Sequence, residues 1–353
     1  MVVTVGVDVH KHTHCAVAVD EAGRQIGKPV TVRATDAGHL QLVRWAARDF
    51  AAARVEFAVE DCRHVSTRLE RALLAAGQVI KRVPPKLMAG ARQSARTRGK
   101  SDPIDALAIA RAALREPNLP VAEHDEVSRE LKLLVDHRED LVNHRTEVIN
   151  RLRWHLHELD PELDPAARSL DRPKHLDRVL ARLGELDQSR VIVQVATELV
   201  ADIRELTRRE SALEREIASR VKQRAPQLLE IPGCGVLTAA KLVGETANPS
   251  RFRSEACFAM HAGAAPIPAS SGKTTRHRLA RGGNRQLNVA LHRIAVTQIR
   301  LTGDGRDYYQ RRKAGGDSTM EALRALKRKI ARRVFLTLNS HDTPSAACQP
   351  QAA

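Results

Sequence analysis

Short segments rich in β-branched and apolar residues follow one another through the first third of the chain. VVTVGVDV (2–9) and HCAVAVD (14–20) have the composition of strands, and residues 21–24 that of a hairpin turn. The full pattern predicts strands at 2–9, 14–20 and 29–33, a helix at 36–50, a strand at 55–60, a helix at 64–75 and a strand at 78–83. Antiparallel strands followed by β-α-β units predict a mixed sheet with helices on its faces.

This layout is that of a ribonuclease H-like (RuvC-like) domain. Its first helix is expected to be capped by Asp36 and to place Leu40, Val43 and Ala47 on one face. The first 120 residues are therefore expected to form one α/β domain.

A longer apolar period replaces this pattern in the middle of the chain. Leucine, isoleucine and valine recur at intervals near 3.5 residues in two runs, with charged residues between them. The two runs are Leu131, Leu134, Leu141, Val148, Leu152, Leu156 and Leu159, and then Ile192, Leu199, Ile203, Leu206, Leu213 and Ile217. They predict an antiparallel helical hairpin or coiled coil at 121–227 that serves as a spacer or oligomerisation arm.

The last part of the chain is punctuated by glycine and is strongly basic. Between positions 273 and 333 there are seventeen Lys and Arg against four acids, so this part carries most of the net charge of +16. We expect a mostly helical, basic domain at 228–340 and a disordered tail at 341–353. Such a charge indicates a polyanionic partner. Because aromatic residues make up only 3% of the chain, nucleic acid should be held by its phosphates rather than by stacking on aromatic rings.

The cysteines and the hydropathy pattern exclude several classes of protein. Five scattered cysteines without CxxC spacing favour neither a disulfide framework nor a zinc site, and indicate a reducing, cytoplasmic environment. We expect no membrane partner, because no apolar run is long enough for a spanning helix, and no secretory signal is evident at the start.

Four carboxylates stand where a metal site would need them. Asp8 lies within the apolar first strand, Glu60 ends a later strand, and Asp102 and Asp105 lie three apart at a helix start in GKSDPIDALAIARAAL. Asp102 alone is equally explained as a helix N-cap, since Pro103 suits the first helical position. Together the four acids match the pattern of a two-metal phosphoryl-transfer site for Mg²⁺ or Mn²⁺. Residues 81–100, which end at Lys100, carry seven basic residues and no acid.

Two segments of the basic domain are candidates for phosphate contacts. In IPGCGVLTAAKL, Gly233 and Gly235 allow a tight turn before a helix, as in helix-hairpin-helix elements, although an ordinary helix–helix turn explains them too. Further on, Ser270, Ser271 and Gly272 precede a group of cations. These cations are Lys273, Arg276, Arg278, Arg281 and Arg285. A loop serine is seldom catalytic, but nearby arginines would stabilise a phosphoryl transition state.

His10, His12 and His14 alternate, and alternation on a strand would place all three on one face. A solvent-facing strand edge explains them as well as a metal does. We expect at most a supporting role near the acids for His10 or Lys11.

The motifs GVDVHK, AVED and GKSDPIDALAIA resemble those of the DEDD transposases and invertases of insertion-sequence family one-ten, relatives of the Piv DNA invertase. IPGCGVLTAAKLVGE, ACFAMHAGAAP and SSGKTTRHRLARGGNRQLN resemble that family's C-terminal transposase domain. The resemblance covers roughly residues 3–334. The chain departs from the family in AVEDCRH, after the second acid, and in Ser101-Asp102, where Asn-Asp is more usual.

The resemblance implies a metal-binding catalytic tetrad of Asp8, Glu60, Asp102 and Asp105. It also implies a nucleophilic serine, Ser271 or, as second choice, Ser270. Implied partners are the DNA of the element's ends and target, a structured guide RNA from the element, and further copies of the chain in a dimer or tetramer.

Three other functions fit parts of the pattern. A Holliday-junction-resolvase-like nuclease would share the fold and metal site but need no serine. An actin-like sugar kinase or ATPase also has Asp in its first strand, yet it needs an adenosine-binding lobe that the basic, helical middle does not provide. A non-catalytic DNA-binding regulator would not need the acids at all.

Overall fold

The computed structural model describes residues 2–61, 63–84, 87, 101–116, 119, 121–122, 125–163, 165–166, 168–269, 277–278, 280 and 282–342. The calls on Lys100, Ser270, Ser271, Gly272, Lys273, Arg276, Arg281 and the tail at 343–353 lie outside these residues. The chain divides into two compact units, Met1–His124 and Asp125–Ala353, and each is described by itself. The finer domain boundaries expected near 120, 227 and 340 stay predictions.

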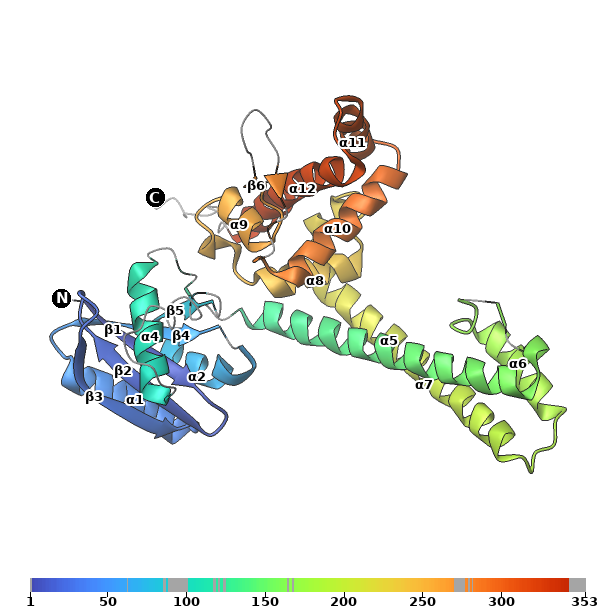
Figure 1. Ribbon diagram of the computed structural model, residues 1–353, viewed down its shortest axis with the longest axis horizontal. Coiled ribbons are helices and arrows are strands. Elements are labelled where there is room, and N and C mark those ends of the chain that lie inside the picture. Colours follow the sequence, from blue (N-terminus) through green and yellow to red (C-terminus); the bar gives the residue numbers. More distant parts are fainter. Residues whose placement is uncertain are drawn as a thin grey trace, which may run out of the picture. The chain divides into compact units, whose positions relative to one another are not determined.

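The first unit is built on a five-stranded mixed sheet (Figure 1). Its strands are β1 (Val2–Val9), β2 (Thr13–Val19), β3 (Gln25–Arg33), β4 (Arg54–Glu60) and β5 (Val79–Val83), in the order β3-β2-β1-β4-β5. β1 pairs antiparallel with β2, and β2 with β3, whereas β4 is parallel to both β1 and β5. The predicted mixed sheet and the hairpin turn at 21–24 are thus confirmed, the turn by a backbone bond of 3.0 Å from Asp20 N to Arg24 O.

Helices cover both faces of this sheet. They are α1 (Asp36–Asp49), α2 (Arg63–Ala75) and α4 (Asp102–Arg115). Val5 and Val7 of β1 pack in one cluster with residues of α1 and α2. On the other face, Ala58 of β4 packs with Ile109 of α4. Successive strand residues point to opposite faces, and helices cover both faces. β1 is therefore buried along almost its whole length, and its sequence is a nearly continuous apolar run.

The buried face of α1 differs from the one expected. Leu42, Trp45 and Ala46 are buried, whereas Leu40 is 47% exposed. Turning the helix this way encloses Trp45, which removes more apolar surface from water than enclosing Ala47 would. The N-cap is Thr35, whose side chain accepts from Gly38 N at 3.2 Å, and Asp36 is the first helical residue rather than the cap.

Two 34-residue helices, α5 (Glu126–Leu159) and α7 (Val191–Arg224), run side by side in the second unit (Figure 1). They are antiparallel, because the residue numbers of the α7 partners fall as the residue numbers on α5 rise. Arg138 pairs with Glu214 at 2.9 Å, and Arg145 with Glu210 at 2.6 Å. Most residues of the two predicted apolar runs are buried between these helices and α6 (Pro173–Gly184), which follows the short η1 (Pro161–Leu163). Supercoiling of the pair stays a prediction.

The rest of the second unit is mostly helical, as expected. Its elements are η2 (Pro226–Glu230), α8 (Val236–Thr246), η3 (Pro249–Arg251), α9 (Glu255–His261), the strand pair β6 (Ile267–Pro268) and β7 (His277–Arg278), α10 (Arg285–Arg300), α11 (Asp304–Ala314) and α12 (Thr319–Asp342). One apolar core joins α8, α10 and α12 to the near ends of α5 and α7. Across the described residues, no helix has the length and hydropathy needed to span a membrane.

Candidate active site

Asp8 lies near the end of β1, on the face that α4 covers. Gly6, two residues earlier on the same face, is in such close contact with α4 that a Cβ there would lie 2.1 Å from Ala106 O. A side chain at position 6 would therefore push the helix off the sheet. This close approach brings the first turn of α4 next to Asp8, which is only 6% exposed.

The first turn of α4 carries the two helical acids. Ser101 is the N-cap, and its carbonyl oxygen accepts from Asp105 N at 3.1 Å. Asp102 is therefore the first helical residue, so the expectation that it might serve only as the cap is wrong. Asp105 is 7% exposed, whereas the side chain of Asp102 is 54% exposed. Negative charge at this end of a helix is favoured by the helix dipole.

Glu60 ends β4, the strand that lies parallel and next to β1. Val59 pairs in register with Val7, which places Glu60 beside Asp8 in the same register. Ala58, two residues before Glu60, contacts α4, so Glu60 is on the α4 face as well. The sheet register and the packing of one helix thus bring all four predicted acids to one end of the sheet.

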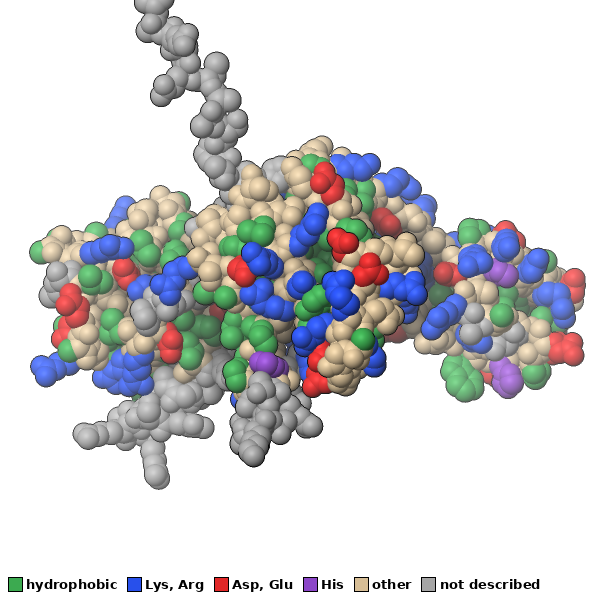
Figure 2. Space-filling view, turned by 90° about the horizontal axis from the view of Figure 1, so that it is seen from above, with side chains coloured by type: hydrophobic (Ala, Val, Ile, Leu, Met, Phe, Trp, Pro, Cys, Tyr) green, Lys and Arg blue, Asp and Glu red, His purple; other side chains and the backbone are tan. Residues whose placement is uncertain are grey.

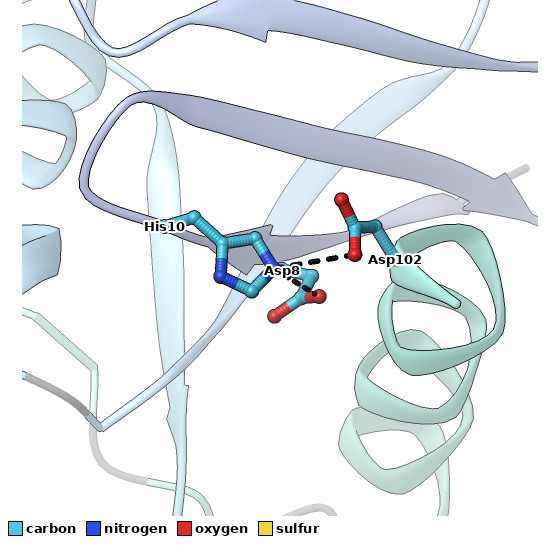
Figure 3. A group of neighbouring side chains, drawn as sticks. All are labelled: Asp8, His10 and Asp102. Atoms are coloured by element: carbon cyan, nitrogen blue, oxygen red, sulfur yellow. Dashed lines mark hydrogen bonds and ion pairs between the residues drawn. The ribbon is translucent and has the colours of Figure 1, made fainter. Parts of the chain in front are cut away.

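His10 joins two of these acids. Its Nε2 lies 3.0 Å from Asp8 Oδ2 and 3.5 Å from Asp102 Oδ1 (Figure 3). In the described part of the chain, Asp8, His10 and Asp102 are the one set of three metal-ligating side chains whose donor atoms lie within 4.8 Å of one another. Glu60 and Asp105 are outside this set. The sequence predicts at most a supporting role near the acids for His10.

Burial has the largest effect on the charge of Asp8 in this cluster. Burial raises the pKa of Asp8 above its usual value, and the nearby carboxylates of Asp105 and Asp102 raise it further. His10 acts in the opposite direction on this pKa, through its charge and its hydrogen bond. A buried carboxylate beside two others is relieved by a bound cation, and carboxylate oxygens are the ligands that Mg²⁺ and Mn²⁺ prefer.

The three alternating histidines do not share a strand face. β1 ends at Val9 and β2 begins at Thr13, so His10 and His12 lie in the connecting turn and are exposed. His14 is buried on β2 and stacks on His39 of α1, with 3.2 Å between their Nε2 atoms. Burial, together with His39, lowers the pKa of His14 to about 4. The expectation of one common face is wrong because a turn interrupts the strand.

The turn around Gly233 and Gly235 leads from η2 into α8. Gly233 has φ +83°, a conformation that favours glycine, and a Cβ there would lie 2.9 Å from Thr297 Cβ of α10. Gly235 is the N-cap of α8, with open space around it. The segment before the turn is the 3-10 helix η2. The helix-hairpin-helix assignment stays a prediction.

The predicted cations that the structure describes here, Arg278 on β7 and Arg285 at the start of α10, are both exposed. Asn284 caps α10 by accepting from Gln286 N at 2.8 Å and Leu287 N at 3.0 Å. Its amide also donates to Glu245 at 2.6 Å. The sequence analysis did not predict this hydrogen bond between Asn284, at the start of α10, and Glu245 of α8.

Comparisons with known proteins agree with the sequence resemblance. A model of the DEDD type for IS110, described as "Transposase", matches residues 5–161. A second model, described as "Transposase IS116/IS110/IS902 family", matches residues 225–310. The first match contains all four acids, and the second contains the serines and the basic segment after them.

Similar curated proteins include proteins of insertion elements from Streptomyces and Mycobacterium. The "insertion element IS116 uncharacterized 44.8 kDa protein" of Streptomyces clavuligerus is 30% identical over 92% of this chain and 92% of its own length. The "insertion element IS900 uncharacterized 42 kDa protein" of Mycobacterium paratuberculosis is 27% identical, over 99% and 98%. Among solved structures, T. thermophilus RuvC in complex with a Holliday junction substrate is 15% identical, with a TM-score of 0.25, over 33% of this chain and 96% of that chain.

Proposed function

Because the chain belongs to the IS116/IS110/IS902 family of transposases, we propose that it cleaves and rejoins the DNA of an insertion sequence as a transposase and site-specific recombinase. The proposed substrates are the ends of the element and its target. A structured RNA from the element is the proposed guide, and the active form is a dimer or tetramer of this chain.

The acid cluster of the first unit is the observation that carries this proposal. A buried carboxylate with a raised pKa, a second acid in its immediate set and a third close enough to raise that pKa form a donor set that fits a divalent cation. Asp8, Glu60, Asp102 and Asp105 would hold Mg²⁺ or Mn²⁺. When bound, such an ion stabilises negative charge on the oxygens of a phosphoryl group during transfer.

The protein's own residues supply the remaining groups. Ser271 is the proposed nucleophile, with Ser270 as second choice. Its hydroxyl oxygen attacks a DNA phosphorus atom, its proton passes to a base, and the displaced DNA hydroxyl leaves with the other strand end. Attack by a new DNA hydroxyl on this ester reverses the step, rejoins the strand and frees the serine.

His10 is placed to orient the acids and to limit their mutual repulsion. Its ring contacts both the buried Asp8 and the more exposed Asp102. Proposed contacts to DNA phosphates are made by the backbone at Gly233 and Gly235 and by basic side chains. These are Lys100, Lys273, Arg276, Arg278, Arg281 and Arg285.

A strand-exchange assay tests the proposal. The assay combines purified protein, DNA carrying the element's ends and target, and the RNA transcribed from the element's non-coding end. Asp8→Asn and Ser271→Ala should each reduce recombination by roughly a thousandfold or more. Asp49→Asn, an exposed acid at the end of α1, is the matched control and should stay close to the wild type. Ser270→Ala tests the second-choice nucleophile.

Two outcomes would contradict this mechanism. Recombination at the wild-type level by both Asp8→Asn and Ser271→Ala would refute it entirely. Full cleavage by a variant with both Ser270→Ala and Ser271→Ala, together with loss in Asp8→Asn, would identify instead a resolvase-like nuclease that needs only the metal site. Omitting the RNA from the mixture tests the guide separately.

A further inference from the structure

A cavity of about 530 Å³ in the second unit has an excess of positively charged side chains in its lining. It lies among the end of α9, the strand pair β6–β7, α11 and α12. Its lining includes six Lys and Arg side chains and only two acids, Asp317 and Glu321. In Figure 2, Lys and Arg side chains gather on the face of the second unit that carries these C-terminal helices.

Both acids in the lining bind neighbouring side chains or backbone groups. Asp317 Oδ2 lies 2.5 Å from Nε of Arg312, so these two charges compensate one another. Glu321 accepts from Ser318 N at 3.0 Å and from the Ser318 hydroxyl, which closes the start of α12. The lining therefore carries six positive side chains against two negative ones.

Some of the cations also have partners. Arg328 pairs with Glu255 at 3.3 Å, and Lys329 Nζ lies 4.0 Å from the ring centroid of Tyr308. Arg278, Arg324 and Lys327 remain, and among the described residues none of these three has an ion-pair partner. Three positively charged side chains thus line one cavity without an ion-pair partner among the described residues.

Lys327 is the most constrained of the three. It is 6% exposed, and its Nζ donates to Asn288 Oδ1 at 2.6 Å. The Asn288 amide is held in turn by its donations to the carbonyl oxygens of Ala262, at 3.0 Å, and Gly263, at 2.8 Å. A neutral amide cannot offset a buried ammonium charge. Burial, with Arg324 adding to it, lowers the pKa of Lys327 to about 8.

We propose that this cavity binds one backbone phosphate of a DNA strand, with Lys327, Arg324 and Arg278 as its donors. The inference rests on the proposed function, which brings DNA to the protein. Phosphate oxygens accept charge-assisted hydrogen bonds from ammonium and guanidinium groups together. The cavity is large enough to admit the phosphate with part of its sugar. The bound anion supplies the counter-charge that the protein does not.

Binding of a fluorescent DNA duplex of arbitrary sequence tests the proposal with the full-length chain. Affinity is measured between about 50 and 200 mM salt, where the slope of log K against log salt counts phosphate contacts. Lys327→Met should weaken binding roughly tenfold and reduce the slope by about one. Lys241→Met is the matched control: this buried lysine contacts the Glu139 carboxylate outside the cavity, and the slope should not change.

Proton uptake gives a second readout that a purely structural role would not produce. A phosphate beside Lys327 should raise its pKa from about 8, so the wild type should take up protons when it binds DNA near that pH. Calorimetry in two buffers of different ionisation enthalpy measures this uptake, which should be absent in Lys327→Met. If that variant does not fold, Arg324→Gln should show the same loss of slope.

The outcomes separate this proposal from the function on which it rests. Wild-type affinity, slope and proton uptake in Lys327→Met would overturn the phosphate site and leave the proposed function standing. Proton uptake with inorganic phosphate but none with DNA would overturn it also, because the cavity would then serve a free anion. Failure of the wild type to bind DNA at all would refute the proposed function itself.

Discussion

Each of the two units contains a buried ionisable side chain that lies among charges of its own sign, and that sign is negative in the first unit and positive in the second. In the first unit, Asp8 lies beside two further acids at the end of a sheet, and burial raises its pKa. In the second, Lys327 lies beside Arg324 on α12, and burial lowers its pKa. In both, the environment favours the neutral form of the side chain.

This comparison indicates which charge a ligand would need in each unit. A charge that the protein buries among like charges costs stability, and such sites persist where a ligand restores the balance. The proposed ligands that would do so are a divalent cation in the first unit and a phosphate in the second. The helical hairpin provides the contrast, since its buried Glu210 pairs with both Arg138 and Arg145.

The largest effect is expected at Lys327, as a change of stability with pH. Its pKa in the folded protein lies below the unfolded value, so the folded state binds fewer protons and its stability rises with pH between about 8 and 10.5. Over that window the wild type should gain about 3 kcal/mol relative to Lys327→Met. Urea unfolding of both proteins near neutral pH and near pH 10 measures this gain. An unchanged difference would show that the ammonium is well solvated.

A smaller effect of opposite sign is expected for the compensated charge. Glu210→Gln leaves Arg138 and Arg145 facing one another across the hairpin, and it should lower the free energy of unfolding by about 2 kcal/mol. The loss stays below that of a fully enclosed pair because both arginines keep some contact with water. Glu205→Gln, an exposed acid on the same helix, is the matched control for urea unfolding. Equal free energies of unfolding for the two variants would show that the buried ion pairs of Glu210 add no stability, and would contradict the contrast with Lys327.

The smallest effect is expected at Asp8 in metal-free protein. Its raised pKa means that the folded state binds more protons than the unfolded state, so its stability falls as pH rises above the usual aspartate range. At neutral pH, Asp8→Asn should therefore raise the free energy of unfolding by about 1 kcal/mol. Adding Mg²⁺ should reverse the order, because the ion stabilises only the wild type. A variant less stable than the wild type in EDTA would contradict the comparison.

Much of the first unit could be read from the chain itself. The strand that contains Asp8 and the strand that ends at Glu60 follow from short apolar segments, and the mixed sheet follows from antiparallel strands followed by β-α-β units. The structure places both acids on one face at one end of the sheet. Local periodicity was sufficient here because strand alternation and connection length leave few other arrangements.

Local patterns failed where one turn or one packing contact decided the outcome. The alternation of His10, His12 and His14 was interrupted by a turn, so only His10 reached the acids while His14 was buried against α1. The helix α1 buried Trp45 rather than the expected face, because the neighbouring sheet and α2 determined which side was covered. Neither choice is encoded in the spacing of nearby residues.

The sequence by itself determined the elements, the four acids and the excess of positive charge near the C-terminal end. Only the tertiary structure decided which of the many cations is buried without a counter-charge. Lys327 is one of seventeen Lys and Arg in its segment, and its environment comes from Asn288, 39 positions away, and from the turn at Ala262 and Gly263. The physical reason is that desolvation depends on every group packed around a charge, whereas a periodic pattern records only its neighbours along the chain.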